Sequence, residues 1–261
     1  MAHCFHLRWQ WLWLATLALA CLGTLLLPGH ASLAQDLSRC HAPPGAAHWL
    51  GTDLLGRDLL LRLLFGTRLS LAVGIGATAL AIALGTALGT LAGYCGGAVE
   101  RLAMRLVDVL YALPLTLLVL LLCAVVGRGF AVLCLAIASL EWLTLARVVR
   151  TQTADLRRRT FVRAAIAMGQ SHRAVIGLHI LPNLLPLLGR YALVLLPNAI
   201  LMESFLGFLG LGIPPPQSSW GNLLVEAIPH MQRHPLSLLL PVLCLFLTLL
   251  ALVSLRREPP Q

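Results

Sequence analysis

The chain has 261 residues, of which 59% are hydrophobic and 11% are charged, and its mean hydropathy is +0.86. A soluble domain has about half apolar and about a quarter charged residues, so this composition excludes a soluble protein and indicates an integral membrane protein. All nineteen basic residues are arginine, and without lysine the chain has neither a Walker A phosphate loop nor Schiff-base chemistry.

The formal net charge of +9 comes from arginines that lie between hydrophobic runs, which indicates membrane topology rather than nucleic-acid binding. The seven cysteines show no C-x-x-C spacing, so neither a disulfide framework nor a zinc site is indicated. A helix needs about 20 apolar residues to cross a bilayer core. This criterion predicts six transmembrane helices, at residues 9–27, 68–94, 112–128, 130–147, 184–205 and 236–255.

The first span, 9–27, has two interpretations. Arg8 precedes it and Ala31-Ser32-Leu33-Ala34 resembles a cleavage site, which is the pattern of a signal peptide. Its apolar core is longer than that of a typical signal peptide, which favours an uncleaved anchor.

The second span carries glycines on one helix face. Gly85, Gly89 and Gly93 recur every four residues, so another helix can approach this face backbone to backbone. The alternative is a helix that is merely rich in small residues. Either interpretation predicts an all-α helix bundle and not a barrel.

Arginines are concentrated in three segments outside the spans. These segments lie on one side of the membrane if the N-terminus also lies on that side. They are Arg101 and Arg105 between spans two and three, seven arginines from Arg147 to Arg173 between spans four and five, and Arg256 and Arg257 after span six. The positive-inside rule makes that side, with both termini, cytoplasmic. We therefore divide the chain into an anchor helix with a periplasmic segment, 1–67, and a five-helix core, 68–261.

The segment between spans four and five predicts an amphipathic helix–turn–helix. Residues 155–168 have apolar positions at helical spacing, and Gly169 ends this helix. A second short helix is expected from about Ser171, closed by Pro182 before span five. Such an element lies on a membrane surface or fills a groove on a partner.

This segment, 155–183, resembles the EAA loop of bacterial ABC importer permeases. The resemblance rests on Ala164-Ala165, on Gly169 after three further residues, and on Leu181-Pro182 twelve residues after the glycine. It implies a coupling helix that docks in a groove of a separate cytoplasmic ATPase subunit. Arg163 stands where the loop commonly has glutamate, so the electrostatics of docking should differ.

Three further segments are similar to the second permease subunit of dipeptide, oligopeptide and nickel importers. They are HWLGTDLLGRD at 48–58; GYCGG at 93–97 followed by Met104-Arg105, Asp108 and Pro114; and ESFLGFLGLG at 203–212 followed by Pro215-Pro216 and Trp220-Gly221. Trp49 replaces the usual proline, and the C-terminus lacks the usual GDxLRDxxDP ending, which puts a cytoplasmic contact of that tail in doubt.

The resemblance implies a type I, MetI-like permease in the bacterial inner membrane that moves substrate but is not an enzyme. Its implied partners are a second homologous permease subunit, two ATPase subunits that bind ATP and Mg, and an external solute-binding protein. Di- or oligopeptides are the expected substrates, and nickel or a metal–chelator complex is the alternative. A self-contained secondary transporter would show an internal repeat with matching broken helices, which the sequence lacks.

Ionisable residues in or near the spans are candidates for the pathway. Glu141 and Glu203 lie in or at the edge of spans, where a charge is costly, and they either line the pathway or pair between helices. Asp108, from the second segment, is the third candidate. Asp53, Arg57 and Asp58 either shape the external mouth or act as a helix cap and surface pairs.

His230 and His234 are four residues apart, as in a metal site on a helix. The sequence shows no third ligand nearby, so a solvated external loop is expected and no metal site is predicted.

Overall fold

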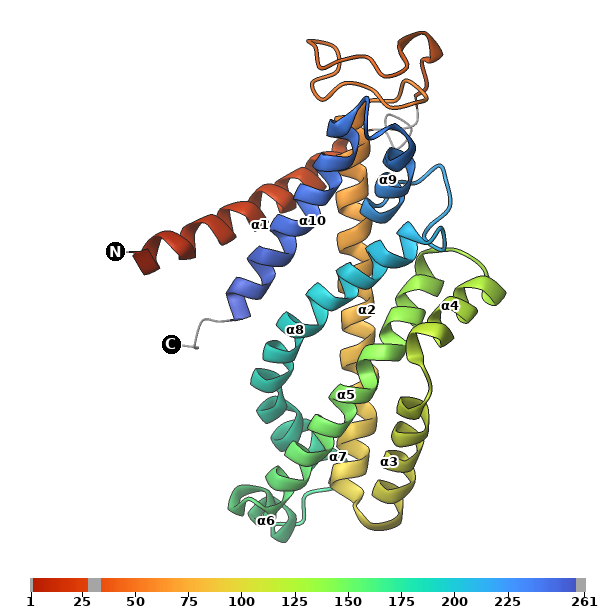
Figure 1. Cartoon of the computed structure of the whole chain (residues 1–261). Coiled ribbons are helices and arrows are strands. Elements are labelled where there is room, and N and C mark those ends of the chain that lie inside the picture. The colour runs from red at the N-terminus through yellow and green to blue at the C-terminus, as the bar shows by residue number, and fades with distance from the viewer. Residues whose placement is uncertain (1, 28–33, 257–261) are drawn as a thin grey trace.

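The computed structural model describes residues 2–27 and 34–256 as an elongated helical bundle (Figure 1). The possible cleavage site at 31–34 therefore lies almost wholly outside the described residues, as does Arg257. The α-helices are α1 Ala2–Leu26, α2 Leu59–Cys95, α3 Gly97–Ala112, α4 Leu115–Val126, α5 Phe130–Arg158, α6 Thr160–Ala167, α7 His172–Val175, α8 Leu181–Phe208, α9 Trp220–Ala227 and α10 Pro235–Arg256.

Five helical segments are long and apolar enough to cross a membrane, at 9–26, 59–95, 130–158, 172–208 and 235–256. The predicted single span at 112–128 is wrong. Helix α4 has only 12 residues, and it meets α3 at an angle of 85°. Pro114 causes the break because a residue before proline avoids helical geometry, and Leu113 is extended (φ −77°, ψ 147°). Counted as one broken span, α3 and α4 give the sixth.

Two other predicted boundaries are wrong. Helix α5 continues to Arg158, so the expected helix at 155–168 is split between α5 and α6. Pro182 does not close a helix, because the chain is helical on both sides of it and runs as one apolar segment from 172 to 208. The π-helical residues 176–180 join α7 directly to α8.

Helix α2 is the central element, and its glycine face lies against α5. A Cβ atom added at Gly89 would be 2.6 Å from the Ala146 carbonyl oxygen and 2.8 Å from Val149 Cβ, and one added at Gly93 would meet the Arg150 carbonyl. The two backbones are therefore in direct contact, as in small-residue helix packing in membranes. Helices α1 and α10 lie side by side at the edge of the bundle, joined by the Trp13 Nε1 hydrogen bond to Thr248 Oγ1 (3.2 Å; Figure 1).

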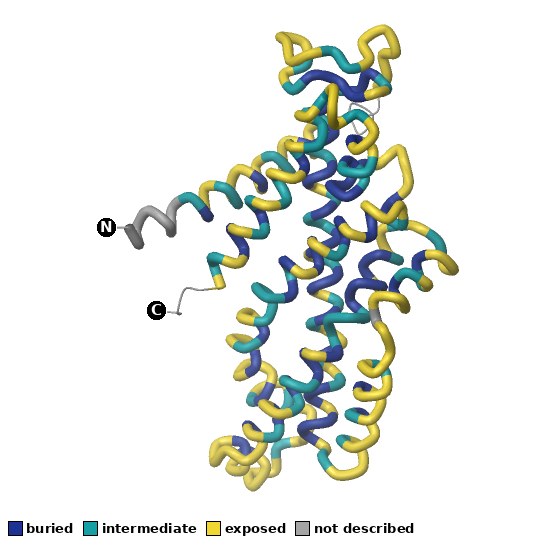
Figure 2. The backbone as a smooth tube through the Cα atoms, viewed as in Figure 1, coloured by how far each residue is buried: buried dark blue, intermediate teal, exposed yellow. Residues whose placement is uncertain are grey.

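Exposed apolar side chains cover the outer faces of the bundle, and buried residues follow the lines where helices meet (Figure 2). In water this pattern would be unstable, whereas lipid tails accept it without cost. Exposed examples on α1, α4 and α10 are Trp11, Leu19, Leu22, Leu121, Val125, Leu239, Leu243 and Phe246.

Trp220 fastens α9 to α2. Its side chain is fully buried, its indole Nε1 donates to Thr67 Oγ1 (3.1 Å), and its backbone N–H donates to Ser70 Oγ (3.0 Å). The replacement Trp220→Phe removes the indole hydrogen bond and some packing volume, so we expect the free energy of unfolding to fall by about 1 to 2 kcal/mol. Thermal unfolding in nanodiscs measures this loss. Trp49→Phe, at an exposed site, is the control and should leave Tm unchanged.

Candidate functional site

Helices α6 and α7 form a helical hairpin that projects from one end of the bundle, here called the α6 end (Figure 1). Val162 and Ala165 are buried and pack into the cluster that includes Val175 and Ile180. Arg163 and Ala164 face outward. The two adjacent alanines of the predicted docking element therefore differ: Ala165 holds α6 to the bundle, and Ala164 is available to a partner.

Gly169 makes the turn between α6 and α7. Its φ of +82° is left-handed, its N–H bonds to the Ile166 carbonyl (3.0 Å), and the N–H of Gln170 bonds to the Ala165 carbonyl (3.1 Å). This pair of bonds is the Schellman motif that ends helices at glycine. Ser171 then caps α7 by accepting from the Ala174 N–H (3.3 Å). A Cβ added at Gly169 meets no atom within 4 Å, so the backbone conformation, not crowding, requires glycine here.

Leu181 and Pro182 are exposed at the start of α8 and are separated from the Gly169 turn by α7 and the π-helical segment. The hairpin is tied to α2 by a hydrogen bond between Tyr94 Oη and His172 Nδ1 (2.7 Å). The sequence does not predict this role for Tyr94, although the residue lies in the GYCGG segment, 93–97.

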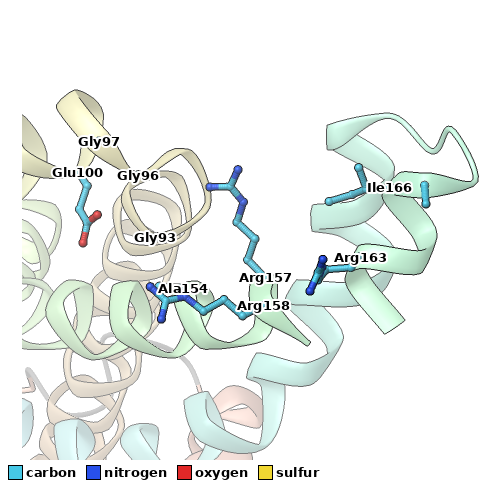
Figure 3. A pocket seen from close by; sticks show the side chains of 10 residues that line it. Gly93, Gly96, Gly97, Glu100, Ala154, Arg157, Arg158, Arg163 and Ile166 are labelled. Carbon is cyan, nitrogen blue, oxygen red and sulfur yellow. The ribbon is translucent and has the colours of Figure 1, made fainter. Parts of the chain in front are cut away.

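A cavity of about 740 Å³ lies beside the hairpin, between the α2–α3 turn, the end of α5 and α6 (Figure 3). Three guanidinium groups line it, those of Arg157, Arg158 and Arg163. Its one lining carboxylate, Glu100, bonds to Arg150 Nη1 (3.0 Å). Sequence reasoning identified Arg163 but not this grouping, because α6 folds back toward the end of α5.

The three pathway candidates do not meet, since no hydrogen bond or ion pair joins any two of them among the described residues. Glu203 of α8 is fully buried among the hydroxyls of Ser70, Ser204 and Ser219. One of its carboxylate oxygens has no hydrogen-bond partner in the described part of the chain.

The other two candidates differ in their surroundings. Glu141 of α5 is partly buried and forms no ion pair with a described residue. Asp108 of α3 is exposed and pairs with Arg147 Nη2 (2.8 Å), whose guanidinium carbon lies 4.4 Å from the centre of the Tyr111 ring. Asp108 therefore joins α3 to α5 in this structure, rather than standing free in a pathway.

An ion network occupies the opposite end of the bundle, here called the α9 end; Asp53 and the two arginines are buried and Glu226 is exposed. Asp53 Oδ2 accepts from Arg57 Nε (2.7 Å) and Arg62 Nη1 (2.8 Å), and Glu226 Oε2 accepts from both arginines. The arginines are only 8% and 3% exposed, so the surface-pair interpretation is wrong for Arg57. The cap belongs to Asp58, which accepts from the Leu61 N–H (3.1 Å). Sequence reasoning missed Arg62 and Glu226.

The environment of Asp53 stabilises its charged form. Burial acts to raise the pKa of this carboxyl, but hydrogen bonds from Arg57 and the charges of Arg57 and Arg62 outweigh it and hold the pKa below its usual value. The network joins the segment before α2 to α9, which is far away in the sequence.

Histidines also meet at the α9 end. The His41 ring stacks on His234 with centroids 4.1 Å apart, and its centroid is 5.0 Å from that of His230. Burial, followed by the charges of His234 and His230, lowers the pKa of His41. No group of three ligand side chains among the described residues is arranged to hold a metal ion.

The architecture defines an all-α, multi-span membrane protein with a helical hairpin projecting from one end of its bundle. Residues 85–257 match the family described as "Binding-protein-dependent transport system inner membrane component". The chain belongs to this family, and it is an inner membrane component of a transport system.

The chain is similar to proteins that are named as permease proteins of transport systems. It is 44% identical over 202 residues to the oligopeptide transport system permease protein OppC of Haemophilus influenzae, covering 77% of this chain and 65% of that protein. It is 36% identical over 234 residues to the dipeptide transport system permease protein DppC of Bacillus subtilis, covering 89% and 73%. It is 38% identical over 238 residues to the glutathione transport system permease protein GsiD of Pectobacterium atrosepticum, covering 91% and 79%. The chain spans just under two thirds of the first relative's length.

Proposed function

We propose that this chain is one permease subunit of an ATP-driven importer and that the α6–α7 hairpin couples it to an ATPase subunit. The observation that carries the proposal is the hairpin itself: Ala164 is exposed on α6, while Val162 and Ala165 are buried and fix α6 to the bundle. A helix fixed in this way moves with the spans when a partner pushes on its outer face. Hydrogen bonding of Tyr94 to His172 extends the link to α2.

The assembly that we propose has four further members. A second homologous permease subunit completes the pathway, two cytoplasmic ATPase subunits bind ATP and Mg and perform hydrolysis, and an external solute-binding protein delivers substrate. The α6 end faces the cytoplasm, because arginines concentrate in the segments at that end, and both chain termini are assigned to the same side of the membrane. The α9 end then faces the binding protein.

Peptides are the proposed substrates. The relatives named above are described as oligopeptide, dipeptide and glutathione permeases, which favours peptides over nickel. Membership of a binding-protein-dependent family also argues against a self-contained secondary transporter. Glu203 and Glu141 stay our candidates for pathway residues, and Asp108 is a weaker one because Arg147 neutralises it.

The replacement Gly169→Val tests the coupling role. Valine is strongly disfavoured at a φ of +82°, so the Schellman turn must distort and move α6 relative to α7. We expect substrate-stimulated ATP hydrolysis by the assembled complex to fall about tenfold, the effect of 1 to 2 kcal/mol of backbone strain. The measurement is ATP hydrolysis in nanodiscs with and without the loaded binding protein.

Gly177→Val is the matched control. Gly177 lies in the π-helical segment between α7 and α8, has no left-handed φ, and has no atom within 4 Å of an added Cβ, so its replacement should change stimulation little. Unchanged assembly and unchanged stimulation in Gly169→Val would show that the hairpin is not the coupling element.

A further inference from the structure

The cavity beside the hairpin carries an uncompensated positive charge. Arg158 and Arg163 form no ion pair with any described residue, and Arg157 only donates to the Cys95 carbonyl (3.4 Å) and lies over the Tyr94 ring. Glu100 is already paired with Arg150, and Asp155 of α5 does not line the cavity. In Figure 3, Arg163 extends from α6 toward the end of α5 that bears the other two.

Three like charges around one cavity repel one another, and an anion placed between them relieves that repulsion. Guanidinium groups also bind carboxylates through two parallel hydrogen bonds, which favours a planar acidic partner. A volume of about 740 Å³ admits more than one side chain. The chemistry of the cavity therefore fits an acidic segment and not an apolar one.

We propose that this cavity receives acidic side chains, at least two carboxylates, from the ATPase subunit that docks at the hairpin. The inference rests on the proposed function and adds a second, electrostatic contact to the helical one. The contact lies on the α2–α3 turn and the end of α5 as well as on α6, so it joins the ATPase to the spans directly.

The position of the cavity along α2 favours a soluble partner over a lipid headgroup. Helix α2 has 37 residues and is about 55 Å long, against a hydrocarbon core of about 30 Å. Arg68 is exposed and lies at or outside the boundary on the α9 side. With Arg68 at that boundary, the other boundary is reached about 20 residues later, near Leu88, so the cavity at Gly93–Gly97 begins about 8 Å beyond it, at the outer limit of the headgroup layer. Helix α6, which forms one wall, lies at that far end (Figure 1).

The test measures the affinity of the ATPase for the permease pair in nanodiscs of phosphatidylcholine, which has no net charge. The variant is Arg157→Gln/Arg158→Gln/Arg163→Gln. We expect its dissociation constant to rise at least about tenfold. Salt screens paired charges at an interface, so the affinity of the wild type should fall between about 50 mM and about 500 mM salt, and the glutamine variant should lose most of this salt dependence.

Two variants control for charge and for folding. Arg101→Gln/Arg105→Gln/Arg256→Gln removes three exposed arginines that do not line the cavity, and its affinity should stay within about threefold of wild type. Arg157→Lys/Arg158→Lys/Arg163→Lys keeps the charge but not the paired hydrogen bonds of guanidinium, so it should recover part of the affinity lost in the glutamine variant.

The results distinguish binding of the ATPase at the cavity from binding of a lipid there. Equal affinity of the glutamine and wild-type proteins for the ATPase would overturn the inference, and retention of phosphatidylglycerol by wild type but not by the glutamine variant would assign the cavity to a lipid instead. Failure of the wild-type pair to bind the ATPase at all would overturn the proposed function together with the inference.

Discussion

Replacing Gly89 and Gly93 together by alanine is expected to prevent stable packing of α2 on α5. The added methyl groups would lie 2.6 Å from the Ala146 carbonyl and even closer to that of Arg150, and both of these are backbone atoms of a helix that cannot rotate away. The helices must separate, and the close contact along α2 is lost. Overpacking costs about 1 to 3 kcal/mol at each site, so we expect a total of about 4 kcal/mol.

The measurements are the yield of monodisperse protein and its Tm in nanodiscs. Gly23→Ala and Gly189→Ala are the controls, since they add the same methyl group to α1 and α8 where no atom lies within 4 Å. If the double variant unfolds at the same temperature as these controls, the α2–α5 contact is not what holds the bundle together.

The glycine face of α2 was predictable from the sequence, but the helix that packs against it was not. A spacing of four residues predicts that Gly85, Gly89 and Gly93 share one side of a helix, because this periodicity depends only on local helix geometry. The identity of the facing helix is a different matter. Helix α5 begins 35 residues after α2 ends, and only the folded packing decides that it, and not α8, lies against the glycines.

The errors at helix boundaries also have physical causes. Hydropathy sums over 112–128 and does not register that proline disfavours helical geometry at Leu113, so it predicts a full span where α4 has only 12 residues, and it does not predict α3. Proline usually ends a helix, which is why Pro182 predicts a helix end, but here the π-helical residues 176–180 lead directly into α8 and the helix continues through Pro182. The turn at Gly169 was predictable because a helix often ends at a residue with left-handed backbone geometry, and glycine is the residue that adopts this geometry most easily.

Networks of distant residues were the least predictable part of the structure. Arg62 and Glu226 are 164 positions apart, and neither lies in a repeating pattern that would join them. Asp53 and Arg57 are four positions apart, which made a pair foreseeable, but their burial depends on α9 covering them. The three arginines likewise line one cavity only because α6 turns back after α5.

Replacing Asp53 by asparagine is expected to destabilise the α9 end by about 3 kcal/mol. Asparagine has no charge, so two arginines that are at most 8% exposed would lose a shared carboxylate and keep Glu226 as their one carboxylate, while Arg62 still donates to Ser218 Oγ. Removing one partner from a buried ion network typically costs about 3 to 5 kcal/mol, and we take the lower end because Glu226 remains. Thermal unfolding in nanodiscs at neutral pH measures the difference.

The difference depends on pH in a defined direction. The pKa of Asp53 is lowered in the folded protein, so its contribution is fully present above the unfolded pKa, near about 4, and is lost as pH falls through the folded pKa. The gap in Tm between wild type and Asp53→Asn should therefore be constant from neutral pH down to about 5 and narrow below about 4. Asp36→Asn, in the same segment but exposed, is the control and should show no comparable gap at neutral pH. A gap that is the same for both variants would mean that the network adds no stability, and the segment before α2 would then be held to α9 by packing alone.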